Sequence, residues 1–250
     1  MLKRSLIRAG LISLIALNAF ASEGYKAHWS YDEKTGSEHW GDLEDKYKIC
    51  KIGNSQSPID LSKKTSKKSD LKKLELHYKN VKLNIKNNGH TIQIDYPAGS
   101  YANFNGKKYD LLQFHFHVPS EHTFSKNAKP MEVHLVHKSK DEQLAVLGVL
   151  FDVRDENKFL AKFWDKLPVN GENKNYNTVI NISDILPENK TYYNYSGSLT
   201  TPPCSEGVNW HVMTTVNYVS QDQVDTFKEF FNHNARPTKP LNEREVKIGN

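Results

Sequence analysis

The sequence predicts a single, mainly β domain built on one large sheet, with a few helices at its periphery. Apolar and polar residues alternate in several segments of the 250-residue chain, which is the pattern of half-buried strands. Helical spacing of apolar residues is rarer and is confined to short segments. No internal repeat and no Pro/Gly/Ser-rich linker divides the chain, so we expect one domain over residues 22–250.

Four segments carry the strand predictions. Residues 81–85 and 92–96 both alternate apolar with polar side chains, and the Asn-Gly pair at 88–89 between them is a hairpin signal. Residues 144–151 form a continuous apolar run, as expected for a strand that is buried on both faces. Alternation returns at residues 208–212. Together these segments predict the large sheet.

Two segments predict helices. Ser220 and Gln223 form a capping-box pattern, and apolar residues follow at helical spacing over 224–231. Asp155 is placed to cap a short helix that carries the apolar residues of 159–163. Both helices are expected on the surface of the sheet.

Residues 1–21 have the pattern of a secretory signal peptide. Three basic residues precede an apolar run at 9–20, and Ala19 and Ala21 form a small-x-small cleavage site. Cleavage after residue 21 lowers the formal charge from +5 to +2. An uncleaved membrane anchor is the alternative, but the run is short for a spanning helix of roughly 20 residues. We expect an exported chain without stable membrane insertion after cleavage, either periplasmic or secreted.

The chain contains two cysteines, Cys50 and Cys204. In an oxidising compartment an even number favours a disulfide, while two separate buried thiols are the alternative. A bridge between them would close a loop of about 155 residues, for which the chain-entropy model gives at most roughly 5 kcal/mol of stabilisation.

A lysine-rich stretch at residues 63–73 raises the question of nucleic-acid binding. Ser, Asp and Leu are interleaved with its lysines, and it has no aromatic side chains on which bases could stack. We therefore interpret it as solvated surface and expect no nucleic-acid partner.

Three histidines indicate a metal site. His115 and His117 are two residues apart in a strand-like segment, so their side chains share one face, and His134 can join them from a paired strand. Gln113 and Glu132 lie two residues before His115 and His134, on the same faces, and can accept a hydrogen bond from an imidazole N–H. For a single histidine, burial in the core is the better interpretation. Three histidines with two such acceptors predict a catalytic Zn2+ site, because three imidazoles leave a fourth position open.

These residues belong to a longer series of motifs in a fixed order. The segments are HWSY (28–31), EHW (38–40), QSPID (56–60), NNGH (87–90), QFHFH (113–117), SEHT (120–123), EVHLVH (132–137), LAVLG (144–148), SLTTPP (198–203) and RP (236–237). With these segments the chain resembles α-class carbonic anhydrases over nearly all of the mature sequence, and so many ordered segments are far more specific than one His-x-His.

The resemblance implies a twisted, mostly antiparallel central sheet with zinc at the bottom of a conical cavity. It also implies reversible hydration of CO2 to bicarbonate and a proton, by attack of zinc-bound hydroxide. Thr200 matches the residue that accepts a hydrogen bond from this hydroxide, and Glu121 the residue that accepts the proton of Thr200. Cys50 and Cys204 match the disulfide of secreted and bacterial members.

Further roles follow from the same resemblance. His90 matches the proton shuttle, and imidazole suits it because its ordinary pKa of about 6.5 is close to neutrality. Val136 shares a face with His134 and would border the substrate. The remaining pocket positions are Val146, Leu199, Thr201 and Trp210. The positions that would hold a chain of water molecules are Tyr31, Asn88 and Gln93.

Two other functions remain open at this point. A zinc esterase would use the same hydroxide, although no site for a larger acyl group is evident. A catalytically weak zinc-binding or adhesion module on the same fold is the second alternative. The partner expected for the enzyme is the small molecule CO2 or bicarbonate, and the chain could be a monomer or a homodimer.

Overall fold

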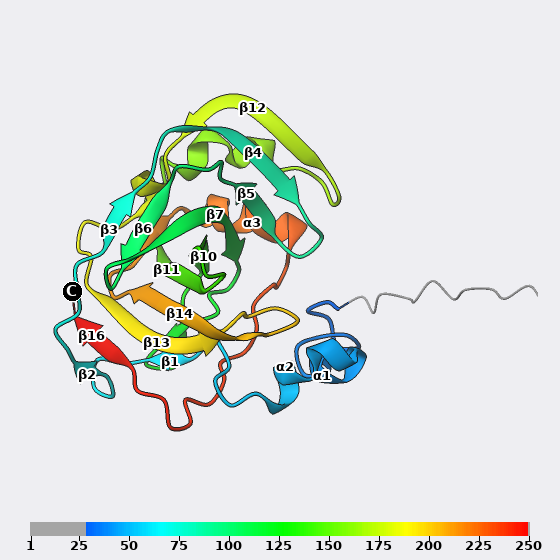
Figure 1. Cartoon of the computed structure of the whole chain (residues 1–250). Helices are drawn as coiled ribbons and strands as arrows, with labels where there is room; N and C mark the ends of the chain where they lie inside the picture. The colour runs from blue at the N-terminus through cyan, green and yellow to red at the C-terminus, as the bar shows by residue number, and fades with distance from the viewer. Residues whose placement is uncertain (1–28, 250) are drawn as a thin grey trace, which may run out of the picture.

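The computed structural model describes residues 29–249 and shows the predicted architecture of one large, strongly twisted sheet with short helices around it (Figure 1). The predicted signal peptide, residues 1–21, lies outside the described residues. Among residues 29–249, no helix combines the length and the apolar character needed to cross a membrane.

The main sheet has 13 strands, of which ten follow one path. In spatial order these are β12 (Asn173–Ile180), β4 (Val81–Asn87), β5 (Ile92–Asp95), β7 (Lys107–His117), β10 (Met131–Lys138), β11 (Leu144–Val153), β14 (Glu206–Met213), β13 (Tyr192–Ser198), β16 (Lys247–Gly249) and β2 (Lys67–Lys68). Beside this path, β6 (Tyr101–Phe104) pairs with β7 and β3 (Glu75–His77), and β15 (Asn217–Val219) pairs with β11. The second sheet consists of β1 (Asp60–Leu61), β8 (Thr123–Phe124) and β9 (Asn127–Ala128).

Most strand pairs of the main sheet are antiparallel, as predicted. The parallel pairs are β11 with β14, β11 with β15, and β16 with β2. Strand β11 contains the apolar run 144–151 and lies between β10 and β14, with both of its faces buried over most of its length. The predicted hairpin is formed by β4 and β5. Gly89 in its turn has a φ of +86°, which glycine adopts without strain.

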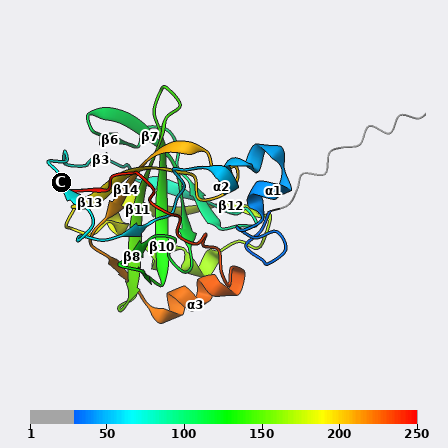
Figure 2. The same cartoon turned by 90° about the horizontal axis from the view of Figure 1, so that it is seen from below.

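The helices lie around the sheet (Figure 2). They are α1 (Trp40–Leu43), α2 (Ile49–Ile52), α3 (Gln221–Phe230) and the 3-10 turns η1 (Asp45–Tyr47), η2 (Leu160–Lys162), η3 (Trp164–Lys166) and η4 (Ile182–Ile185). Helix α3 begins at the predicted capping box, in which Ser220 Oγ accepts from the backbone N–H of Gln223 at 3.1 Å. Its Phe227 packs against Phe116 of β7, with ring centroids 6.3 Å apart.

The prediction that Asp155 caps a helix at 159–163 was wrong. Asn157 takes this role, because its Oδ1 accepts from the backbone N–H groups of Phe159 and Leu160 at 3.1 and 3.2 Å. The turn is a 3-10 turn that starts at Leu160, too far along the chain for Asp155 to reach. Gln223 fixes Asn157 in turn, since its Oε1 accepts from the Asn157 N–H at 2.8 Å.

The predicted disulfide between Cys50 and Cys204 is present, with a Cα–Cα distance of 5.0 Å. It joins the end of the helical N-terminal region to the loop that follows β13. Both cysteines are buried in a small cluster with Trp40. The bridge therefore ties together segments that are 154 residues apart in the sequence.

Two histidines are buried in the apolar core, away from the predicted metal site. His211 on β14 stacks on Phe104 with ring centroids 4.2 Å apart, and His137 on β10 packs edge-on against the same ring at 5.3 Å. A hydrogen bond of 2.8 Å joins His137 Nε2 to the Tyr78 hydroxyl. Burial lowers the pKa of His137 to about 4, and burial together with the nearby His137 lowers the pKa of His211 to about 3. Both side chains are therefore neutral at neutral pH.

The buried His211 predicts acid sensitivity. An unfolded chain binds a proton at this imidazole below about pH 6.5, whereas the folded chain resists protonation down to about pH 3, so acid favours unfolding. Stability should fall by about 1.4 kcal/mol per pH unit for this group as the pH drops below 6.5. We expect His211→Leu to show a shallower decline between pH 6.5 and 4, measured as the free energy of urea unfolding at each pH.

The exposed His77 supplies the control. His77→Leu should leave the pH dependence of stability as it is in the wild type. Parallel curves for the wild type and His211→Leu would show that this buried imidazole does not contribute to acid unfolding.

Candidate metal centre

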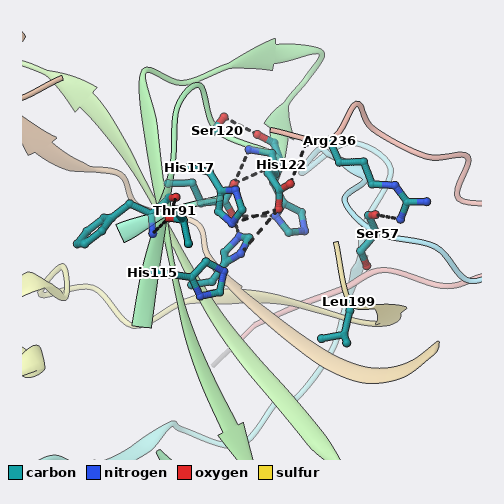
Figure 3. A network of polar contacts seen from close by, with 12 residues as sticks. Ser57, Thr91, His115, His117, Ser120, His122, Leu199 and Arg236 are labelled. Atoms are coloured by element: carbon teal, nitrogen blue, oxygen red, sulfur yellow. Dashed lines mark hydrogen bonds and ion pairs between the residues drawn. The ribbon is translucent and has the colours of Figure 1, made fainter. Parts of the chain in front are cut away.

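The pairing of β7 with β10 brings the three predicted histidines together. His115 lies opposite His134 in the antiparallel register, and His117 is two residues further along β7 on the same face. Each imidazole offers one nitrogen such that the three atoms lie within 4.8 Å of one another, which is close enough to share one metal ion (Figure 3). The opposite face of β7 carries Phe114 and Phe116, which are fully buried in the core and hold the strand in place.

Each imidazole has its other nitrogen fixed by a hydrogen bond. The Nδ1–H of His115 donates to Gln113 Oε1 at 2.8 Å, and the Nε2–H of His134 donates to Glu132 Oε1 at 2.9 Å. His117 donates from Nδ1 to the backbone carbonyl of Asn234 at 2.7 Å. These contacts leave Nε2 of His115, Nε2 of His117 and Nδ1 of His134 to face a common point.

One buried nitrogen without a hydrogen-bond partner supports the binding of a metal ion at this point. His117 Nε2 is buried and has no hydrogen-bond partner within the described part of the chain. A buried polar atom without a partner is destabilising unless something else satisfies it. Three imidazole nitrogens in this arrangement fit a zinc ion, which imidazole binds well and which takes four ligands.

At two of the three histidines, electrostatics favours the neutral imidazole that metal binding requires. Burial lowers the pKa of His117, and burial together with the neighbouring histidines lowers the pKa of His115 well below its ordinary value. Burial acts in the same direction on His134, but the Glu132 carboxylate outweighs it and raises the pKa of His134. Burial would raise the pKa of Glu132, yet His122 and His134 hold it well below its ordinary range. Glu132 is therefore a carboxylate that orients His134.

Glu121 lies beside this cluster. Its Oε1 accepts from the backbone N–H of Arg236 at 2.9 Å, and its Oε2 faces His117 Nε2 at 3.6 Å and His134 Nδ1 at 3.8 Å. Within residues 29–249 this Oε2 has no hydrogen-bond partner, so the expected hydrogen bond from Thr200 is not formed in this structure. Thr200 itself is buried. The roles assigned to Thr200 and Glu121 therefore stay predictions.

A cavity of about 130 Å³ opens onto two of the histidines. Eight of the residues that the sequence assigned to the site and to the water chain line it together. They are Tyr31, Asn88, His90, Gln93, Gln113, His115, His117 and Thr201, with Trp29 and Thr91 in addition. His90 stacks on Trp29, with ring centroids 3.6 Å apart and planes 10° from parallel.

The predicted apolar wall lies on the His134 side of the site. Val146 and Trp210 are buried in one apolar cluster, and Val136 and Leu199 pack against it while remaining partly exposed. The Trp210 ring lies 4.9 Å from the His134 ring. The structure thus groups four of the five residues assigned to the substrate pocket, all except Thr201, in a cluster whose Trp210 lies against His134, a predicted metal ligand.

Three residues contribute more to the site than sequence reasoning assigned to them. The side-chain amide of Asn234 donates to the carbonyls of His90 and Phe116, at 3.0 and 2.9 Å, while its own carbonyl orients His117. His122 Nδ1–H donates to Glu132 at 2.7 Å. The Arg236 guanidinium is buried and donates to the carbonyls of Ser57 and Cys50, both at 2.8 Å. His122 lies in the SEHT motif and Arg236 in the RP motif, but Asn234 has no local signal in the sequence.

A family model described as eukaryotic-type carbonic anhydrase matches residues 36–249. The chain belongs to the carbonic anhydrase family. Hydration of CO2 is the general function of this family, whose α-class members are metalloenzymes, and the chain is an enzyme of it.

Individual carbonic anhydrases agree with this assignment over most of their length. The chain is 38% identical to a carbonic anhydrase of Neisseria gonorrhoeae, with 97% of each protein covered, and 43% identical to one of Nostoc, with 88% of this chain and 85% of the other covered. A solved structure of the α-carbonic anhydrase from Thermovibrio ammonificans, in complex with the inhibitor sulfanilamide, superimposes with a TM-score of 0.86 at 43% identity. The superposition covers 88% of this chain and 99% of the Thermovibrio ammonificans chain.

Proposed function

We propose that this carbonic anhydrase is an exported zinc enzyme that interconverts CO2 and bicarbonate with release of a proton. The observation that carries the proposal is the set of three convergent imidazole nitrogens, each on a ring whose other nitrogen is fixed by a separate acceptor. Export is supported by the signal pattern at residues 1–21 and by the disulfide between Cys50 and Cys204.

The ligands would be His115 and His117 through Nε2 and His134 through Nδ1. In carbonic anhydrases, zinc on three histidines lowers the pKa of a bound water to about 7, from 15.7 in bulk water, and so supplies a nucleophile at neutral pH. The protein contributes rigidity, because Gln113 and Glu132 fix two of the rings on neighbouring strands.

The residues around the cluster divide into a polar and an apolar side. Val136, Leu199 and Trp210 would hold CO2, which is small and apolar, beside His134. On the polar side, the carboxylate of Glu121 would accept a hydrogen bond from the Thr200 hydroxyl, so that the Thr200 oxygen is left to accept a hydrogen bond from the attacking oxygen. This arrangement would aim the nucleophile at the carbon of CO2.

Fast turnover also requires that the product proton leaves. A group of pKa about 7 releases its proton to water at only about 10³ per second, if recapture is diffusion-limited. Fast carbonic anhydrases reach about 10⁶ per second. His90, in the same cavity as His115 and His117, would carry the proton from the site toward buffer.

Replacing His90 with alanine should slow turnover without weakening substrate capture. We expect kcat for CO2 hydration in dilute buffer to fall by about 10- to 100-fold, because only slow release to water remains, while kcat/KM changes little. Added imidazole should restore kcat. Unchanged turnover in dilute buffer would remove His90 from the proton path.

The proposed function is tested by stopped-flow CO2 hydration on protein loaded with one equivalent of zinc. The same protein after chelation, and His115→Ala treated identically, serve as controls. Zinc-dependent hydration supports the proposal. Bound zinc without hydration would favour a binding module, and hydrolysis of 4-nitrophenyl acetate without CO2 hydration would favour an esterase.

A further inference from the structure

A second cavity adjoins the one that reaches the metal centre. It measures about 280 Å³, and the residues around it include Tyr31, Asp32, His90 and His233. Tyr31 and His90 also line the inner cavity of about 130 Å³ that contains His115 and His117. His90 therefore stands at the boundary of the two cavities, with the metal ligands on one side and His233 on the other.

The backbone holds His233 next to a residue that contacts both His90 and His117. His233 directly precedes Asn234, whose side chain donates to the carbonyl of His90 and whose carbonyl orients His117. The His233 ring meets the Tyr31 ring edge-on, with centroids 6.3 Å apart. His90 is only half exposed, whereas His233 is exposed to solvent. His233 is thus positioned on the solvent side of the outer cavity, and His90 on its inner side.

We propose that His233 is a second imidazole of the proton path, which receives the proton from His90 and passes it to buffer. This inference rests on the proposed CO2 hydration. His90 takes up the proton released by hydration and becomes an imidazolium. The proton then moves from His90 to neutral His233. A buffer base finally removes the proton from His233, so both rings end neutral. Imidazole is the side chain suited to both steps, since its charge changes between pH 5 and 8.

Confinement explains why this transfer competes with direct collision of buffer with His90. His233 is fixed on the wall of the cavity that His90 also lines, so its effective concentration near His90 should exceed that of millimolar buffer in solution. His233 would then present the proton at the surface, where bulky bases reach it. The contribution of His233 to kcat should be greatest when the buffer is dilute, or when its molecules are too large to approach the half-buried His90.

The test compares His233→Ala and His233→Gln with the wild type by stopped-flow CO2 hydration. Both variants should lower kcat roughly two- to threefold in dilute buffer, because one of two exit routes is lost, and leave kcat/KM unchanged. The loss should be larger with a bulky sulfonate buffer such as TAPS than with imidazole. His233→Gln keeps a polar side chain beside Tyr31, so a structural role would spare it, whereas a relay role would not.

His77→Ala is the matched control, because His77 is equally an exposed histidine but lines neither cavity. Equal kcat for wild type and both His233 variants in every buffer would overturn the relay, as would a parallel loss of kcat/KM. An inactive wild type would instead refute the proposed function. With active wild type and slowed His90→Ala, a null result at His233 counts against this inference alone.

Discussion

His117→Ala is expected to lose both zinc and CO2 hydration. The substitution removes the buried Nε2 atom that has no hydrogen-bond partner, and it leaves two imidazoles to hold the ion. Loss of an outer partner of a metal ligand typically lowers affinity or activity by about 10- to 100-fold, so loss of the ligand itself should exceed about 100-fold. Zinc content after dialysis against a chelator, and hydration rate on the same samples, measure the effect.

Gln113→Ala provides the graded control. This variant keeps all three ligands but frees the Nδ1–H of His115, so we expect an affinity loss of only about 10- to 100-fold. The order wild type, Gln113→Ala, His117→Ala should appear in both zinc retention and activity. Full zinc retention by His117→Ala would place the metal elsewhere.

Removing the disulfide should cause the largest loss of stability. The bridge closes a loop across 154 residues, and the chain-entropy model gives at most about 5 kcal/mol for a loop of that length. Because folded proteins are stable by only about 5–15 kcal/mol, the double variant Cys50→Ser/Cys204→Ser should lose a large share of its free energy of unfolding. Urea unfolding followed by tryptophan fluorescence measures this loss.

The same variant should also affect activity, since the bridge holds the loop that carries Thr200. The Cys204 N–H donates to the carbonyl of Thr201 at 2.8 Å, and Gln56 Nε2 donates to the carbonyl of Cys204 at 3.0 Å. Wild-type protein treated with a phosphine reductant should reproduce the variant. If oxidised, reduced and double-variant proteins unfold at the same urea concentration, the bridge does not stabilise the fold.

Local patterns in the sequence predicted much of the fold. The two-residue periodicity of strands placed His115 and His117 on one face, and short-range turn and capping chemistry predicted the hairpin after β4 and the start of α3 at Ser220. The prediction for Asp155 was wrong because local patterns could not decide between two capping residues. Asp and Asn are both good caps, and only the tertiary contact with Gln223 shows that Asn157 starts the turn.

Contacts between distant segments could not be read in this way. Asn234 contacts His117 across 117 residues, and Arg236 contacts Cys50 across 186 residues. Neither contact produces a periodic pattern in the sequence. The pocket positions Val146, Leu199 and Trp210 were found only through resemblance to a family, because burial looks the same in a pocket wall and in a core. Pattern reasoning thus predicted the three histidines and two of their acceptors, while the third acceptor, the Asn234 carbonyl, is supplied by the tertiary fold.

The hydrogen bond from His117 to the carbonyl of Asn234 also bears on the order in which the chain matures. All three predicted ligands lie on the paired antiparallel strands β7 and β10, which are synthesised well before residue 234. A nascent chain can therefore pair these strands early, but His117 obtains its orienting acceptor only when nearly the whole polypeptide has emerged. Tight metal binding at this cluster would accordingly be a late event, and it would report that the C-terminal segment has docked.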